Sequence, residues 1–144
     1  MSKFILKFFL IFMFIFNFHQ KAFALDDGIY TGLYKIVYAH GESSSRKNDK
    51  GVFEFTIKDN KVIKLFAYDD PNWKFYNLRY FYKIDPETNE LSGFSKGNDP
   101  QSGGTFKINM KGVFIGSKFA GNGNVELTSP DSLIFEKFIF ESLD

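Results

Sequence analysis

From residue 28 onward, apolar and polar residues alternate in short runs that are separated by Gly, Asn, Asp and Pro. Alternation with a period of two is typical of β-strands with one buried face, and no long helical period follows residue 28. The pattern predicts an all-β fold of eight or nine strands. Because strands joined by short turns pair with their neighbours and closure removes unpaired edges, we expect a single small antiparallel meander, closed or nearly closed into a barrel. A β-sandwich is the alternative.

The first half of this pattern predicts one long strand and a hairpin. In the strand 28–38, Tyr30, Tyr34 and Tyr38 are expected to share one face. The runs 52–58 and 61–68 are separated by Asp59-Asn60, two residue types that tolerate the positive φ of a two-residue type I′ turn. The segment 40–50 is polar throughout and is predicted to be a mobile loop.

The second half predicts further strands and a turn. The run 76–84 alternates, and only Phe81 breaks its apolar–polar order. Gly121-Asn122-Gly123 is predicted to reverse the chain. The last run, 133–141, follows Ser129-Pro130-Asp131, which also suits the start of a short helix. Its aromatic and β-branched residues favour a closing strand instead.

Residues 1–24 have the features of a cleavable secretory signal peptide. Lys3 and Lys7 precede an unbroken apolar run over residues 8–16, and Ala22-Phe23-Ala24 supplies small residues at the two positions that a signal peptidase reads. The predicted cut lies between Ala24 and Leu25. An uncleaved anchor is the alternative, but the apolar run is only about half of the roughly 20 residues that a spanning helix needs. We therefore expect a periplasmic or secreted protein with one β domain over residues 25–144 and no transmembrane segment after cleavage.

Composition narrows the chemistry of that domain. The chain has no cysteine, so disulfides, thiol catalysis and cysteine zinc sites are excluded. The whole chain has 18 Lys and Arg against 17 Asp and Glu, and loss of three lysines with the leader leaves 15 against 17, a net charge of −2. Such a balance argues against a general nucleic-acid binder and against a polybasic membrane-binding patch.

Catalytic and metal-binding patterns are weak. His40 precedes Ser43-Ser44-Ser45, but a polar loop lacks the rigid base and orienting group of a Ser–His site. Three pairs of residues could supply oxygen ligands to calcium, but turns explain them and none has the spacing of a calcium loop: Asp26-Asp27, Asp69-Asp70 and Asn98-Asp99. Four glutamates alternate with apolar neighbours and are predicted to face outward: Glu54, Glu126, Glu136 and Glu141. We expect no cofactor, no metal and no enzymatic activity.

The aromatic residues carry the strongest functional signal, because tyrosine combines a large apolar body with a polar tip. Seven residues are candidate ligand contacts: Tyr30, Tyr34, Phe53, Trp73, Tyr76, Tyr80 and Tyr82. They would line a cavity that holds an apolar guest. Two alternatives stay open, an exposed recognition patch and a core filled with rings whose hydroxyls reach the barrel rim.

The leader, the Gly-x-aromatic sequence Gly28-Ile29-Tyr30 and the predicted meander together resemble small lipocalin-type barrels. The resemblance covers the architecture and implies a barrel. Lipocalins have tryptophan where this chain has Tyr30, and a basic residue late in the chain packs over it. Here the one tryptophan is Trp73 and the arginines are Arg46 and Arg79, so no functional residue is carried over.

These observations lead to a ranked set of hypotheses. The first is an exported, non-enzymatic binding protein that holds a small apolar, amphipathic or lipid-like ligand between aromatic strand faces. The second is an interaction or accessory module that meets another protein of the cell envelope, which exposure of Trp73 and Phe81 would favour. A small outer-membrane barrel and a hydrolase are ranked below both.

Overall fold

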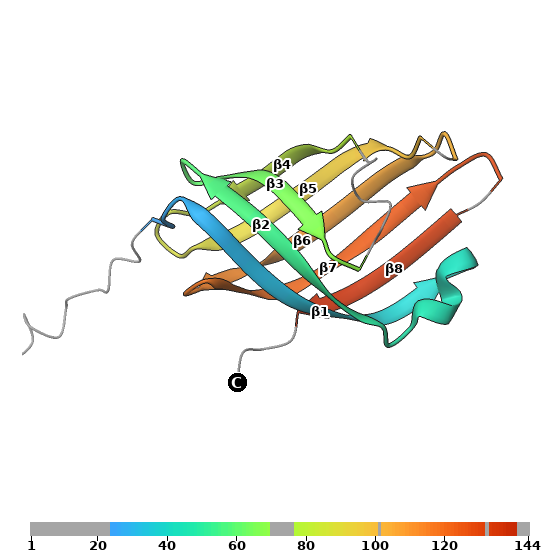
Figure 1. The fold of residues 1–144 in the computed structure, drawn as a ribbon, viewed down its shortest axis with the longest axis horizontal. Coiled ribbons are helices and arrows are strands. Elements are labelled where there is room, and N and C mark those ends of the chain that lie inside the picture. The colour runs from blue at the N-terminus through green and yellow to red at the C-terminus, as the bar shows by residue number, and fades with distance from the viewer. Residues whose placement is uncertain (1–23, 70–76, 101, 132, 141–144) are drawn as a thin grey trace, which may run out of the picture.

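The computed structural model describes residues 24–69, 77–100, 102–131 and 133–140. Within these residues, eight antiparallel strands form one nearly closed, barrel-shaped sheet (Figure 1), which confirms the predicted fold class. The strands are β1 (Gly28–His40), β2 (Lys50–Lys58), β3 (Lys61–Ala67), β4 (Arg79–Ile84), β5 (Glu90–Asn98), β6 (Thr105–Ile115), β7 (Lys118–Thr128) and β8 (Leu133–Phe140).

The order of strands around the sheet is β3-β2-β1-β8-β7-β6-β5-β4. β1 therefore joins the first and last parts of the chain, pairing with β2 on one side and with β8 on the other. The amide of Thr31 also donates to the carbonyl of Ser117 at 3.0 Å, next to the start of β7. The sheet ends at β3 and β4, which are adjacent (Figure 1), and Asn60 Nδ2 donates across this seam to the carbonyl of Ile84 at 3.0 Å.

The predicted hairpin is present as β2 and β3. Asp59 and Asn60 connect the two strands with φ of 50° and 57°, as a type I′ turn requires. Asn89, with φ of 58°, ends the connection from β4 to β5 in the same left-handed region. β8 confirms that the run from Leu133 forms a strand and no helix.

The prediction for Gly121-Asn122-Gly123 is wrong, because this segment lies inside β7. The chain reverses earlier, at Gly116-Ser117, where Gly116 has a φ of 59°. Gly123 is needed for close packing: a Cβ on it would lie 2.6 Å from Cζ of Phe138 and 2.9 Å from Cγ of Met110. Here glycine makes room for neighbouring side chains, and no turn is required.

The predicted shared face of Tyr30, Tyr34 and Tyr38 is also only partly present. Tyr30 and Tyr34 are buried, but the pairing register of β1 with β8 shifts between Ile36 and Tyr38. Such a bulge inserts one residue and turns the following side chains to the opposite face. As a result, 47% of Tyr38 is exposed.

The polar segment after β1 contains regular structure where the sequence predicted only a loop, and its mobility stays a prediction. Its first part forms a short 3₁₀ helix, η1 (Gly41–Arg46), which packs beside β1 and β8 at one end of the barrel (Figure 1). Ser43 is buried, and its hydroxyl donates to the carbonyl of His40 at 3.2 Å. No helix within the described residues combines the length and apolar character needed to cross a membrane.

Candidate functional site

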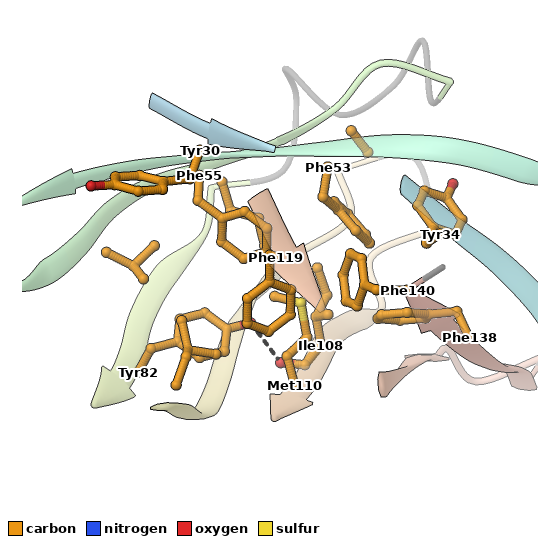
Figure 2. Close-up of a cluster of buried hydrophobic side chains, with 14 of the residues drawn as sticks. Tyr30, Tyr34, Phe53, Phe55, Tyr82, Ile108, Met110, Phe119, Phe138 and Phe140 are labelled. Atoms are coloured by element: carbon orange, nitrogen blue, oxygen red, sulfur yellow. Dashed lines mark hydrogen bonds between the residues drawn. The ribbon is translucent and has the colours of Figure 1, made fainter. Parts of the chain in front are cut away.

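The barrel interior is filled by aromatic rings in contact with one another (Figure 2). Phe119 is at the centre, with its ring centroid 4.9 Å from Phe55, 4.9 Å from Phe114 and 4.7 Å from Phe140. These distances are typical of tilted and edge-to-face packing, which adds to the stabilisation from burial. The sequence produces this arrangement because every second residue of these strands points inward.

The tyrosine hydroxyls of the interior are satisfied by protein groups. The Tyr30 hydroxyl donates to the carbonyl of Asp26 at 2.8 Å, and that of Tyr34 donates to the carboxylate of Asp69. Tyr82 donates to the carbonyl of Ile108 at 3.1 Å (Figure 2). Figure 2 shows the Tyr30 and Tyr34 hydroxyls at opposite ends of the ring cluster. Burial raises the pKa of Tyr82 well above the ordinary phenol value, so this hydroxyl stays a neutral donor.

The structure therefore brings together four of the seven predicted ligand contacts. Tyr30, Tyr34, Phe53 and Tyr82 are buried in the ring cluster, and Tyr80 packs against it while half-buried. Trp73 and Tyr76 lie outside the described residues. Contact of these side chains with a ligand stays a prediction.

A second arrangement closes the end of the barrel beside η1. Arg46 lies between two carboxylates, with Nη1 3.2 Å from Oε1 of Glu136 and Nη2 3.2 Å from Oδ2 of Asp69. The carboxylate of Asp69 also accepts the hydrogen bond from Tyr34. We call Tyr34, Arg46, Asp69 and Glu136 the end cluster. It connects β1, η1, β8 and the residue pair that follows β3.

Glu136 was expected to face outward, but only 5% of it is exposed. The bulge in β1 lies opposite β8, and Arg46, which is half-buried, supplies a partner from 90 residues away in the sequence. Burial raises the pKa of the Glu136 carboxyl above its ordinary value, while the attraction of Arg46 opposes that shift. Sequence reasoning missed Arg46, Asp69 and Glu136 as a cluster, because no local signal brings them together.

The predicted proximity of His40 and Ser43 is present only through the main chain, because the Ser43 hydroxyl donates to the carbonyl of His40. In the described part of the chain, no three His, Asp or Glu side chains are grouped closely enough to hold a metal ion.

A hollow of about 650 Å³ lies at the Tyr30 end of the barrel. Tyr30, Phe114 and Asn89 contribute to its lining. The side-chain oxygen of Asn89 is buried without a hydrogen-bond partner. A buried acceptor of this kind is unfavourable unless something donates to it.

The outer surface of the barrel carries a stacked aromatic pair. Phe81 on β4 lies directly opposite Phe94 on β5, and their ring centroids are 4.9 Å apart at 25°. Phe81 is 45% exposed, and Phe94 is half-buried. The sequence contains a signal for this pair, because Phe81 breaks the apolar–polar alternation of its strand. That break places an aromatic residue on the polar face of β4.

Comparison of this chain with protein-family models, with curated proteins and with solved structures gave no match.

Proposed function

We propose that this chain is an exported, non-enzymatic binding module of the cell envelope, and that it binds its partner through the outer surface around Phe81 and Phe94. The observation that carries the proposal is the contrast between interior and surface. Inside, side chains such as Phe55 and Phe119 are fully buried against other rings. Outside, an aromatic pair is held rigidly on two paired strands and is open to a partner.

Rigid aromatic side chains on a strand face are effective binding contacts, because little conformational entropy is lost when a partner covers them. The closed, ring-filled barrel supplies that rigidity. Export is supported by the leader pattern of residues 1–24, and an N-terminus at Leu25 in protein recovered from the cell exterior or periplasm would test it.

The binding test compares the double variant Phe81→Ser, Phe94→Ser with a matched control, Ile63→Ser, Ile115→Ser. Both control residues are exposed apolar side chains away from the aromatic pair. Binding of each purified chain to an isolated envelope fraction is measured over a concentration series. The account expects saturable binding that weakens at least about 10-fold in the double variant and stays near wild type in the control. Equal binding by wild type and double variant would remove the proposal.

The hollow beside Tyr30 favours a second candidate function, binding of a small amphipathic molecule. Its apolar part would lie against Tyr30 and Phe114, and its polar part would lie beside Asn89. Titration with fatty acids and their amides, followed by tyrosine fluorescence, tests this candidate. A response that disappears in Asn89→Ala but survives in Phe81→Ser would favour it over the surface-binding module.

A further inference from the structure

The aromatic pair on the outer surface is surrounded by cations. Arg79, Lys96 and Lys107 lie directly opposite one another on β4, β5 and β6, so they form one row across three strands. Four residues further along β4 and β6, Lys83 and Lys111 form a second row with Ser92 between them. The rings lie between the two rows. We call these residues the basic face: Arg79, Lys83, Lys96, Lys107, Lys111, Phe81 and Phe94.

The first row is unfavourable for the sheet itself. Like charges directly opposite each other on paired strands are destabilising, and Lys96 has such a neighbour on both sides. Among the described residues, none of the five cations forms an ion pair. Glu126 lies opposite Lys107 at the margin of the face and offsets part of the charge there. Folding still gathers an excess of positive charge across β4, β5 and β6.

The lysines of this row are held over the rings. Nζ of Lys96 is 5.5 Å from the centroid of Phe81, and Nζ of Lys107 is 5.0 Å from that of Phe94. These cation–π contacts keep the ammonium groups at the surface in defined positions. They also cover the ring faces, which nucleic-acid bases need for stacking. This observation favours a partner that presents many phosphates on a surface over a single-stranded nucleic acid.

We propose that the basic face binds the surface of an anionic phospholipid bilayer. The ammonium and guanidinium groups would contact lipid phosphates, and the two phenylalanines would lie at the headgroup level, where aromatic side chains are favoured. The net charge of −2 for residues 25–144 does not oppose this, because charges farther away than about 10 Å are largely screened. The inference rests on the proposed function, since it names the envelope partner of the same surface.

The test is co-sedimentation of the full chain with extruded vesicles. One set is pure phosphatidylcholine, and the other contains phosphatidylglycerol as well. The variant Arg79→Gln, Lys96→Gln, Lys107→Gln is compared with the control Lys35→Gln, Lys47→Gln, Lys50→Gln. The three control residues lie on β1, on β2 and between them, and other strands separate them from β4, β5 and β6 in the sheet. The two triple variants share one N-terminus and one net charge, so a difference between them reports the location of the charge.

We expect wild type and control to bind the anionic vesicles at about 0.1 M salt, and the first variant to bind about 100-fold more weakly. Its stability in denaturant should equal or exceed that of wild type, because repulsion in the row is relieved. A second variant, Lys83→Gln, Lys111→Gln, should also bind more weakly than wild type.

Equal weakening in the control, or no preference for anionic vesicles, would overturn the inference. Tighter binding to an oligothymidine than to vesicles would overturn it as well. If the inference fails but the Phe81→Ser, Phe94→Ser variant still binds the envelope fraction more weakly than wild type, the proposed function remains supported.

Discussion

Tyr34 connects the interior of the barrel to its end. Its ring stacks on Phe53 at 4.8 Å, and its hydroxyl donates to the carboxylate of Asp69 in the end cluster. Burial, followed by the hydrogen bond and the negative charge of Asp69, raises the pKa of this phenol well above the ordinary 10.0. One side chain therefore contributes both packing and a hydrogen bond to a charged group.

Tyr34→Phe should lower the free energy of unfolding by about 1–3 kcal/mol, because a carboxylate loses a donor. The native state keeps this phenol protonated where the unfolded chain ionises, so wild type should lose stability as pH rises above 10. Urea unfolding across that range should show a smaller alkaline loss in the variant. Tyr38→Phe, with its exposed ring, serves as control and should change stability by less than about 0.5 kcal/mol. A pH profile unchanged in Tyr34→Phe would contradict this assignment.

Glu136 has an effect of the same sign in the acid range. Because its pKa is raised above 4.5, the native state binds a proton where the unfolded state has released it. The stability that this carboxyl contributes therefore falls as pH rises above 4.5. In a comparison of wild type with Glu136→Gln, the difference in unfolding free energy should shift against wild type between about pH 4.5 and neutrality. If the difference in unfolding free energy stays constant, or shifts in favour of wild type, the attraction of Arg46 outweighs the effect of burial on the pKa of Glu136.

At the scale of elements, glycine determines how closely β6 and β7 approach. Gly112 and Gly121 lie directly opposite each other, and a Cβ on Gly112 would lie 2.6 Å from Cζ of Phe119 and 2.8 Å from Cα of Gly121. Neither the backbone of β7 nor the buried ring of Phe119 can move away easily. The close approach of β6 and β7 at this point therefore requires glycine on both strands.

Gly112→Ala should therefore lower the free energy of unfolding by about 1–3 kcal/mol or more. Gly28→Ala is the matched control, because nothing lies within 4 Å of the added Cβ. Guanidinium unfolding of both variants measures the difference. Equal stability of the two would mean that β6 and β7 are packed less closely than described.

The elements show which features a sequence predicts. Asp59-Asn60 was assigned correctly, because its turn depends only on local conformational preference. Gly121-Asn122-Gly123 was misassigned, because glycine in a strand reports contacts with residues such as Phe138 that are distant in sequence. The face of the sheet on which Tyr38 lies depends on a bulge in the pairing of β1 with β8. The end cluster depends on a contact between Arg46 and Glu136, which are far apart in the sequence. Period-two burial thus predicts the barrel but does not predict its irregularities, and these place the polar groups.

At the scale of the whole molecule, the interior provides stability, and we propose that the outer surface provides binding. Phe119 is fully buried among rings, whereas Phe81 is half-exposed on the opposite side of the sheet. Phe119→Ala should lower the free energy of unfolding by about 3–5 kcal/mol, and Phe81→Ala by about 1 kcal/mol or less. Thermal and denaturant unfolding measure both effects. A larger loss from Phe81→Ala would assign that ring to the core.

The basic face also shows why net charge is a weak guide at this scale. Five of the 15 Lys and Arg in residues 25–144 gather on three neighbouring strands. The sequence alone gives no sign of this, because the three residues of the first row come from separate strands and become neighbours only through strand register. The argument from overall charge against a polybasic patch therefore does not apply to this surface.

The central claim is that rings fill the barrel and that binding takes place outside it. A crystal structure of the chain grown with saturating palmitate tests this claim most directly. The account predicts that Phe55, Phe119 and Phe140 remain in mutual contact, with no density between them. Continuous density for a fatty acid that separates these rings would contradict the account and assign the interior as the binding site.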